Sequence, residues 1–332
     1  KWLYDDRTVV REEPPVRVEE DETTWVGKTG NVVRDFGGET PFSLNLAASK
    51  HLETPATKPD LAELLKIEPR PSAAGFAILG KSRSGQVEIE TVEIQSADHV
   101  WLPAWLFLPR TGTTPRKVLT VLEHFGRSVR WKEGGLYQEL AAKGIAVCAP
   151  DLRWMGDLRP EYGKGARNHA SWHQDEEQWS WSSLIFGRPM LGQRVTDLLA
   201  VISGIGRHPR LEDAGIIVTA RGQLTVPALC AAAMEEAIAK LYLASGLVSF
   251  RSFVETEEYS HPFANIVPRM LRYTDLPQLA SHVSPRPITL AGTVDAGGRT
   301  LGVAEVEKVY GDLTNLKVLS EAAWNTETME RL

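Results

Sequence analysis

The sequence has little of what marks a disulfide-stabilised or membrane-spanning protein. Only two of its 332 residues are cysteines, and both lie in apolar stretches, IAVCAP around Cys148 and VPALCAAAM around Cys230. Such cysteines are predicted to be small buried side chains that say nothing about the redox compartment. No run of about 18 apolar residues occurs, so no transmembrane helix is expected.

The sequence also lacks a basic bias. It has 37 Lys and Arg against 43 Asp and Glu, which gives a net charge of -6. Proteins that bind nucleic acid or anionic membranes normally cluster Lys and Arg on one surface. We therefore expect neither nucleic acid nor a membrane as a partner, and small neutral or polymeric substrates fit better.

No signal peptide is visible, but the chain begins at Lys1 rather than at Met and both ends look cut. We expect a piece of a longer polypeptide, in which a missing signal says nothing about secretion. Residues 1–84 are rich in Glu, Pro, Thr and Gly, with short apolar islands and an amphipathic stretch from Asp60 to Ile67. They are predicted to form an N-terminal extension or a connector between modules, ahead of a domain over residues 85–332.

After residue 85 the apolar pattern predicts a β-hairpin and then alternating strands and helices. The hairpin consists of VEIETVEI and VWLPAWLFLP around a turn at residues 96–98. Strands are predicted at 117–124, 145–151, 214–220, 241–245, 286–292 and 315–321, and helices at 131–144, 191–205, 227–240 and 301–313. This alternation indicates a mostly parallel sheet with helices on both faces. A hairpin that leads into such units is the order of the α/β-hydrolase fold.

The α/β-hydrolase fold places its nucleophile on a sharp strand-to-helix turn of the form G-x-S-x-G, because only small residues fit there. The corresponding turn is ARGQL, directly after the strand at 214–220, and it puts Gly222 at the nucleophile position. Glycine has no side chain that could attack a carbonyl. Acyl-enzyme chemistry from this turn is therefore excluded.

The other two members of a Ser-His-Asp triad are expected after the last two strands. No histidine follows the strand near Leu316–Ser320, because His282 is the last histidine of the chain. Asp295 stands in the turn after the preceding strand, where the fold keeps its orienting carboxylate. An Asp before Ala-Gly-Gly is equally ordinary turn chemistry, so both interpretations of Asp295 stay open.

The oxyanion hole of this fold consists of backbone N–H groups, which survive the loss of side chains. One donor is expected at Gln223 and the other in the loop from Glu123 to Arg127, with Phe125 as the candidate. His124 could contact a ligand or satisfy its own loop. Arg221, beside the vacated position, could bind a carboxylate such as a uronic acid, or it could fill the pocket and block it.

The segment from His169 to Trp181, HASWHQDEEQWSW, gathers aromatic, histidine and acidic residues between sheet elements. Its tryptophans Trp172, Trp179 and Trp181 could stack on sugar rings. The segment could instead form a lid, or its tryptophans could pack it onto the body of the domain.

Metal binding by this segment is a further possibility. His169 and His173 have the spacing that places two ligands on one helix face, together with Asp175 or Glu176. The pattern specifies no third ligand, however. We therefore predict no metal and no cofactor.

Other polar residues have structural interpretations. Arg188 and Arg194 lie near Asp197 around a predicted helix start, where a buried ion pair that holds the preceding segment is favoured over substrate binding. A displaced nucleophile would need a tight turn and a partnered base. Neither is found around the candidate serines Ser128, Ser245 and Ser249.

Four stretches carry a family resemblance: TGNVVRDFGGETPFSLN, SLIFGRPMLGQRVTDLLAVI, the run from LVSFRSFVETEEY to VPRMLRYTDLPQLA, and SPRPITLAGTVDAGG. With them the chain resembles acetyl xylan esterase-like α/β-hydrolases, particularly the second module of tandem bacterial carbohydrate esterases. The resemblance implies deacetylation of plant polysaccharides or a related hydrolysis by a Ser-His-Asp triad, and a secreted or periplasmic bacterial protein. The chain departs from that pattern at Gly222 and after the last strand, and it matches at Asp295.

These departures favour a catalytically degenerate esterase module that takes a carbohydrate or small ester ligand and assists an upstream hydrolase module of the same polypeptide. Two alternatives stay open. One is an active hydrolase with a rearranged site, in which His124, or His169 and His173, act with Asp295 and a water. The other is a carbohydrate-binding module that uses the tryptophan-rich segment.

Overall fold

The computed structural model describes residues 2–3, 9–10, 18–52, 57–69, 75–110, 114–159 and 172–332, with the backbone alone at 2–3, 9–10 and 172–175. The chain divides into two compact units, Lys1–Lys50 and His51–Leu332.

The first unit consists of short elements. An antiparallel pair of strands, β1 (Trp2–Leu3) and β2 (Val9–Val10), precedes the helices α1 (Asp21–Thr24), α2 (Val32–Phe36) and α3 (Pro41–Ser49). The Asn31 side chain accepts a hydrogen bond from the Arg34 N–H, and Thr40 and Ser43 form a capping box at α3. Among the residues described in this unit only Ser49 is buried, so caps rather than a core stabilise these helices.

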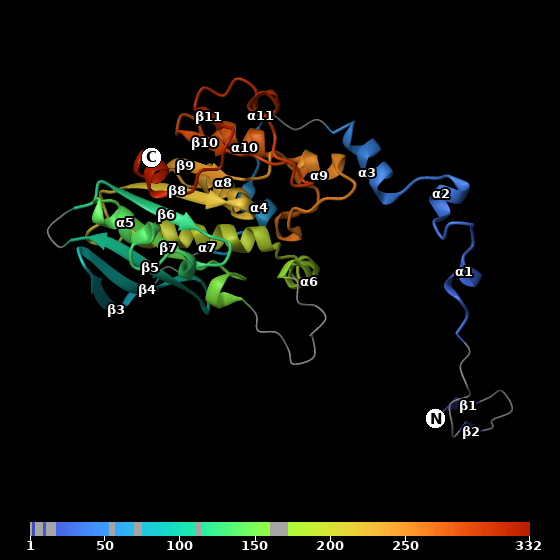
Figure 1. The fold of residues 1–332 in the computed structure, drawn as a ribbon, viewed down its shortest axis with the longest axis horizontal. Coiled ribbons are helices and arrows are strands. Elements are labelled where there is room, and N and C mark those ends of the chain that lie inside the picture. Colours follow the sequence, from blue (N-terminus) through green and yellow to red (C-terminus); the bar gives the residue numbers. More distant parts are fainter. Residues whose placement is uncertain are drawn as a thin grey trace. The chain divides into compact units, whose positions relative to one another are not determined.

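Nine strands form the sheet of the second unit: β3 (Phe76–Ser84), β4 (Val87–Ala97), β5 (Val100–Pro109), β6 (Lys117–Leu122), β7 (Ala146–Pro150), β8 (Gly215–Arg221), β9 (Ile238–Ala244), β10 (Ile288–Ala291) and β11 (Leu316–Leu319). Their order is β11-β10-β9-β8-β6-β7-β5-β4-β3 (Figure 1). The strands β3, β4 and β5 pair antiparallel, β5 also pairs antiparallel with β7, and β6 to β11 are parallel. The predicted hairpin and the predicted mostly parallel α/β sheet are confirmed.

Helices pack on both faces of this sheet. The larger core contains side chains from α4 (Leu61–Leu65), α7 (Met190–Ile205), α8 (Thr225–Met234), α10 (Leu276–Val283) and α11 (Val303–Tyr310). A smaller core contains α5 (Leu136–Ala142) and Met329 of α12 (Thr326–Glu330). Two further helices, α6 (Trp172–Ile185) and α9 (Arg251–Glu255), lie in the connections that follow β7 and β9.

Strand residues alternate between the two cores, because successive side chains of a strand point to opposite faces. On β5, Leu106 and Leu108 belong to the larger core and Phe107 to the smaller one. Both cysteines are fully buried free thiols, and burial raises the pKa of each to about 12. In the described part of the chain no helix is long and apolar enough to cross a membrane.

Two elements inside residues 1–84 belong to the second unit. The amphipathic stretch after Asp60 forms α4, where Leu61 and Leu65 are 3% and 0% exposed in the larger core and the Asp60 side chain caps the helix. The strand β3 extends the sheet by pairing with β4. The compact unit therefore begins at His51 rather than at residue 85, since edge pairing and helix packing both draw on residues with weak sequence patterns.

The predicted helix at residues 227–240 extends beyond the helix that the structure contains. The helix α8 ends at Met234, and Ile238 already pairs with Ile216 of β8 in the sheet. Alanine and glutamate favour helix in this stretch, but the backbone of Glu235 is extended. Tertiary pairing with β8 and β10 therefore outweighs local helix propensity here.

Candidate functional site

Gly222 lies in a sharp strand-to-helix turn, as the sequence predicts. The strand β8 ends at Arg221, a short 3-10 turn covers Gly222–Leu224, and α8 follows. The φ angle of Gly222 is +59°, and no atom lies within 4 Å of the position where a Cβ would stand. The Thr225 hydroxyl donates to the Gly222 carbonyl at 2.8 Å, which closes the turn. A serine side chain would find space here, but none is present.

The loop after β11 occupies the region in which a catalytic histidine would be expected. The Trp324 indole Nε1 donates to Glu123 Oε1 at 2.6 Å, at the start of the loop after β6. The Tyr242 hydroxyl donates to the Ala323 carbonyl at 2.6 Å. Because an indole N–H can only donate, Trp324 cannot accept a proton as a general base.

Asp295 stabilises its own loop through hydrogen bonds to Arg299. Its carboxylate accepts from the Arg299 backbone N–H at 2.9 Å and from Arg299 Nε at 3.1 Å, and its backbone N–H donates to the Arg299 carbonyl at 3.0 Å. Arg299 also reaches Glu305, with Nη1 at 3.1 Å from Oε1. These contacts are what turn chemistry requires, and they engage both carboxylate oxygens of Asp295.

The two predicted oxyanion donors have no acceptor in the part of the chain that is described. Neither the Phe125 N–H nor the Gln223 N–H donates to another described residue. The Phe125 ring is 61% exposed and meets the His124 ring edge to face, with centroids 4.9 Å apart. Two backbone donors without a described acceptor therefore lie beside the turn at Gly222.

The Gln223 side chain is the centre of a buried polar network. Its Oε1 accepts from Arg194 Nη1 at 3.3 Å, and its Nε2 lies 2.5 Å from His124 Nδ1 and 3.3 Å from Glu176 Oε2. Arg194 Nη2 and Glu176 Oε1 form an ion pair of 2.6 Å. Since a guanidinium only donates, the amide oxygen must face Arg194 and the amide nitrogen must face His124. His124 therefore accepts at Nδ1, and that nitrogen is not free to take a proton from a nucleophile.

A second pair of polar residues holds the elbow from the other side. Asn265 is fully buried, and its Nδ2 donates to the Gln223 carbonyl at 2.8 Å and to His261 Nε2 at 2.9 Å. Both amide hydrogens of Asn265 are thus used. The turn at Gly222 is held by side chains from α6, α7 and the segment after β9, none of which supplies a nucleophile.

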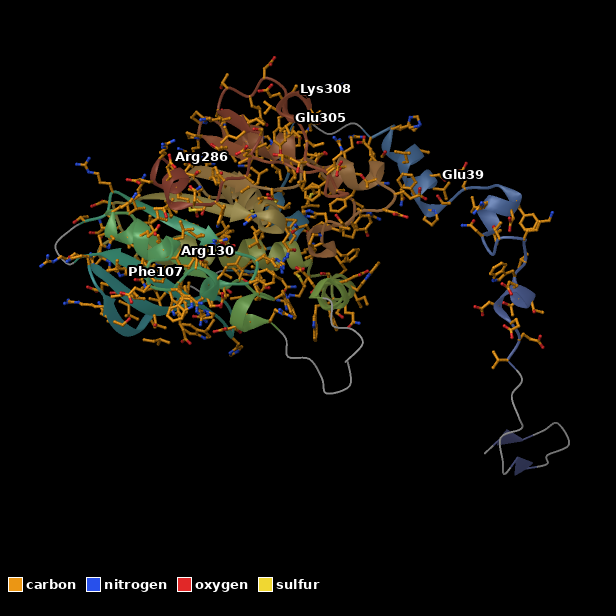
Figure 2. All side chains as sticks on the ribbon, viewed as in Figure 1. Glu39, Phe107, Arg130, Arg286, Glu305 and Lys308 are labelled. Atoms are coloured by element: carbon orange, nitrogen blue, oxygen red, sulfur yellow. The ribbon has the colours of Figure 1, made fainter. Side chains whose placement is uncertain are left out.

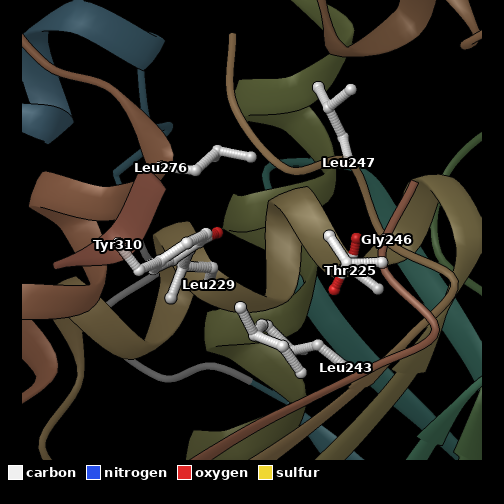
Figure 3. Close-up of a pocket in the computed structure, with 9 residues that line it drawn as sticks. Thr225, Leu229, Leu243, Gly246, Leu247, Leu276 and Tyr310 are labelled. Atoms are coloured by element: carbon white, nitrogen blue, oxygen red, sulfur yellow. The ribbon is translucent and has the colours of Figure 1, made fainter. Parts of the chain in front are cut away.

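A small enclosed cavity lies behind the elbow (Figure 3). Its volume is about 10 Å³, room for about one water molecule and none for a substrate. Gly246 passes close to its wall, because a Cβ there would lie 2.4 Å from Thr225 Oγ1. The other residues labelled around it are Leu229, Leu243, Leu247, Leu276 and Tyr310. This cavity is a packing gap and not a ligand site.

Comparisons with known proteins agree with this architecture. No family model and no curated protein matches the sequence. The fold is similar to that of a Bacteroides fragilis protein assigned as an acetyl xylan esterase, with a TM-score of 0.67, 14% identity, and coverage of 85% of this chain and 82% of that one. The acetyl xylan esterase of Paenibacillus sp. R4 has a TM-score of 0.54 and 19% identity over 89% of this chain and 94% of its own. Acetyl xylan esterase 1 of Thermoanaerobacterium sp. has a TM-score of 0.53 and 15% identity, with coverage of 86% of this chain and 93% of its own.

The chain has an acetyl xylan esterase-like α/β-hydrolase fold. At these identities the comparisons establish the fold alone, so the activity depends on the residues at the elbow. The α/β-hydrolase fold places the ends of β6, β8, β10 and β11 at one edge of the sheet, and Phe125, Gly222, Asp295 and Trp324 follow those ends.

The tryptophan-rich segment forms α6, which the α/β-hydrolase body holds through two aromatic stacks. Trp179 stacks on Trp154 with centroids 5.2 Å apart, and Trp181 stacks on Phe263 at 4.5 Å. The two indoles are 41% and 52% exposed, so packing onto the body leaves part of each ring accessible. His169 and the side chains of residues 172–175, among them Trp172 and His173, lie outside the described residues. Among those that are described, no group of three His, Cys, Asp or Glu could hold a metal.

One buried ion pair attaches this segment to the α/β-hydrolase body, and the partners of Arg194 and Asp197 differ from the predicted ones. Arg194 pairs with Glu176 of α6, whereas Asp197 pairs with Arg153, whose Nε lies 2.9 Å from Asp197 Oδ1. Arg153 also reaches Glu68 at 2.7 Å. Nothing in the sequence around Arg153 marks it as the partner. Only its place after β7 brings it beside α7.

The remaining candidate residues are either exposed or hold other parts of the structure. Arg221 is exposed, and its side chain forms no hydrogen bond or ion pair with a described residue. Ser249 is buried and donates to Asp275 at 2.6 Å, and Ser245 has a φ of +51° beside the elbow. Ser128 is exposed, and Arg188 lies 3.5 Å from Glu68. Gln223 was predicted only as a backbone donor, and its side-chain role was missed because its partners are 29 to 99 residues away.

Proposed function

We propose that this protein is a degenerate carbohydrate-esterase module that no longer hydrolyses esters at its elbow. We further propose that it assists an active hydrolase module upstream in the same polypeptide in the breakdown of carbohydrate esters. The observation that carries the proposal is Gly222, a glycine with a φ of +59° at the turn where the fold presents its nucleophile. Without a side chain at this point no acyl-enzyme can form.

The groups around Gly222 support the same conclusion. The chain has no histidine after His282, and Trp324 in the last loop can only donate a proton. The Nδ1 atom of His124 is already an acceptor for Gln223. Neither Trp324 nor His124 Nδ1 is therefore available as the base that would activate a nucleophile at this turn.

Esterase activity of the purified chain tests the proposal directly. We expect turnover of p-nitrophenyl acetate no faster than in buffer with an equal mass of an unrelated protein. Turnover above that level that a single substitution such as His124→Ala abolishes would contradict the proposal, and it would favour the rearranged hydrolase site instead. The assisting role predicts faster release of acetate from acetylated xylan when the module is joined to an active esterase than when the two are mixed.

Carbohydrate binding is a second candidate function, which the exposed rings of Trp179 and Trp181 favour. Indole faces beside the edge of the sheet can stack on the apolar faces of sugar rings. Calorimetry with xylan oligosaccharides checks this candidate, and heat of binding that Trp181→Ala removes is the expected result.

A further inference from the structure

One face of the strand β5 carries a row of flat side chains. Trp101, Pro103 and Trp105 lie on the same face, because successive side chains of a strand alternate. Trp101 is 42% exposed, and the other two are partly exposed. Phe107, labelled in Figure 2, is next on this face and packs against Tyr137 of α5, with ring centroids 5.4 Å apart. The row is therefore covered from Phe107 onward and accessible before it.

The Trp101 ring is fixed against the edge of the sheet. Part of it packs on the backbone at Gly75, where a Cβ would lie 2.5 Å from the ring atom Cη2. The Gln95 side chain reaches the same place, since its Oε1 accepts from the Gly75 N–H at 3.4 Å. A ring that is held in this way loses little conformational freedom when a ligand stacks on its exposed part.

A row of polar side chains on β4 runs beside the flat row. The register of the two strands pairs the flat row with Gln95, Glu93 and Thr91, in that order. Paired residues share a face of the sheet and lie on strands about 4.8 Å apart. All three polar residues are partly exposed. The Thr91 hydroxyl, the Glu93 carboxylate and the Gln95 Nε2 have no partner among the described residues.

The end of the flat row at Trp105 is widened by the segment after β6. The Trp131 ring lies 5.6 Å from the Trp105 ring between centroids and is 44% exposed. The Arg127 guanidinium lies 5.1 Å over the Trp105 ring, and its charge is paired with Asp151. We define the β5 platform as the two rows together with this ring: Trp101, Pro103, Trp105, Gln95, Glu93, Thr91 and Trp131.

Flat apolar surfaces beside accessible hydrogen-bonding groups match a chain of sugar rings. A sugar ring has apolar C–H faces that stack on indoles, and its edge carries hydroxyls that both donate and accept. Trp101 and Trp105 are four residues apart, about 13 Å along the strand, which is longer than one sugar ring. An apolar protein surface would bury Thr91 and Glu93 without partners. A polyanion would be repelled by Glu93, which forms no ion pair with a described residue.

We infer that the β5 platform binds a linear neutral polysaccharide. Sugar rings stack on Trp101 and on the indoles at the other end, while hydroxyls bond to Gln95 and Thr91. The platform is separate from the turn at Gly222, because β6 and β7 lie between β8 and β5 in the sheet. The inference rests on the proposed function and deepens it, since a module that assists a carbohydrate esterase has to hold the polymer.

Calorimetric titration of the full chain with xylotetraose, cellotetraose, xylose and tetragalacturonic acid tests this inference. We expect at least one neutral tetrasaccharide to bind about tenfold more tightly than xylose, which can stack on one ring only, and more tightly than the anionic chain. Trp101→Ala should weaken that binding about tenfold. Trp101→Tyr, which keeps a flat ring, should retain most of it. Trp181→Ala removes an exposed indole of α6 and is the matched control, which should leave the binding unchanged.

Glu93→Gln tests the selection against anionic chains without removing an indole. It should leave binding of the neutral tetrasaccharide within about twofold, because an amide still bonds to hydroxyls. Binding of tetragalacturonic acid at low salt should become stronger, because a repelling charge is lost. This variant keeps the inference testable if Trp101→Ala does not fold, which circular dichroism shows.

Three results would overturn the inference. One is binding that Trp181→Ala removes and Trp101→Ala leaves unchanged, which would assign the saccharide to α6. Another is the absence of heat with both neutral tetrasaccharides, and the third is wild-type binding of tetragalacturonic acid as tight as that of the neutral chains. Ester hydrolysis by the wild-type chain would contradict the proposed function and leave these titrations unaffected.

Discussion

The backbone conformation of Gly222 resembles that of the residue that carries the nucleophile in this fold, but a glycine has no side chain that could act as one. A residue with a φ of +59° is costly for every amino acid except glycine, and an α/β-hydrolase accepts that cost in order to expose a serine. Here the position is glycine, so the strain is absent together with the hydroxyl. The open space at the Cβ position means that the turn has room for a side chain at residue 222.

A serine at residue 222 should therefore give the turn the side chain of a nucleophile without giving the protein esterase activity. We expect Gly222→Ser to leave p-nitrophenyl acetate turnover at background, since no histidine follows β11 to activate the hydroxyl. The positive φ should lower the free energy of unfolding by about 1 kcal/mol, measured by urea denaturation. Gly187→Ser is the matched control, because Gly187 has a φ of +66° and open space at its Cβ position away from the elbow. Measurable turnover by Gly222→Ser would show that a base had been overlooked.

Glu90 is a buried carboxylate whose ionisation stabilises the fold. Burial alone would raise its pKa, but hydrogen bonds from His208 Nε2 at 2.9 Å and from Lys81 outweigh burial and lower the pKa to about 2. Because the pKa in the folded state is below its unfolded value, this stabilisation is fully present above pH 4.5. It is lost as the pH falls toward 2.

Glu90→Gln should accordingly lower the free energy of unfolding at pH 7 by about 2–3 kcal/mol, and by much less near pH 2.5. Urea denaturation of wild type and variant across this range measures the difference. Glu93→Gln on the same strand serves as the control. A loss that stays constant from pH 7 to pH 2.5 would be inconsistent with a role of the Glu90 charge.

Among the elements, α6 is the one whose position depends most on buried charge. Arg194 of α7 is fully buried, and its ion pair with Glu176 links α6 to the core below the elbow. Removing one partner of such a pair leaves the other charge buried without compensation. The aromatic stacks of Trp179 and Trp181 add contacts on either side of α6, but they do not neutralise a charge.

Arg194→Met should therefore destabilise the protein by about 3–5 kcal/mol. The double variant Arg194→Met with Glu176→Leu should recover most of that loss, because apolar residues of similar size often replace a buried pair at little cost. A double-mutant cycle by urea denaturation provides both values. If the double variant is as unstable as the sum of the single variants, the pair is not coupled as the structure indicates.

At the scale of the whole molecule, the two units differ in what stabilises them. The hydrophobic core clusters draw their buried residues from Leu61 onward, whereas the described residues of the first unit bury only Ser49. A core of this size is enough for a domain to fold independently. The first unit has no comparable core in its described part.

Residues 51–332 should therefore fold without residues 1–50. We expect the shortened chain to unfold cooperatively with a Tm within about 4 °C of the full chain, a difference that corresponds to a change of 1 kcal/mol or so. Circular dichroism melts of the two chains check this. An insoluble or non-cooperative shortened chain would show that the core needs the first fifty residues.

Local patterns in the sequence were enough for the fold class and for the place of Gly222 in the turn after β8. Alternating strands and helices predicted the mostly parallel sheet, and the strand-turn-helix pattern around ARGQL located Gly222, because both are features of neighbouring residues. The absence of a histidine between β11 and Leu332 was equally visible. Boundaries that depend on pairing were not visible, as the early end of α8 and the strand β3 show.

Only the tertiary structure decided what fills the edge of the sheet. Gln223 meets His124 across 99 residues and Glu176 across 47, and Trp324 meets Glu123 across 201. The turn at Gly222 is determined by consecutive residues, whereas the residues that contact it are determined by how the sheet and the helices pack. For that reason the sequence could locate the turn at Gly222 and could not name the residues that surround it.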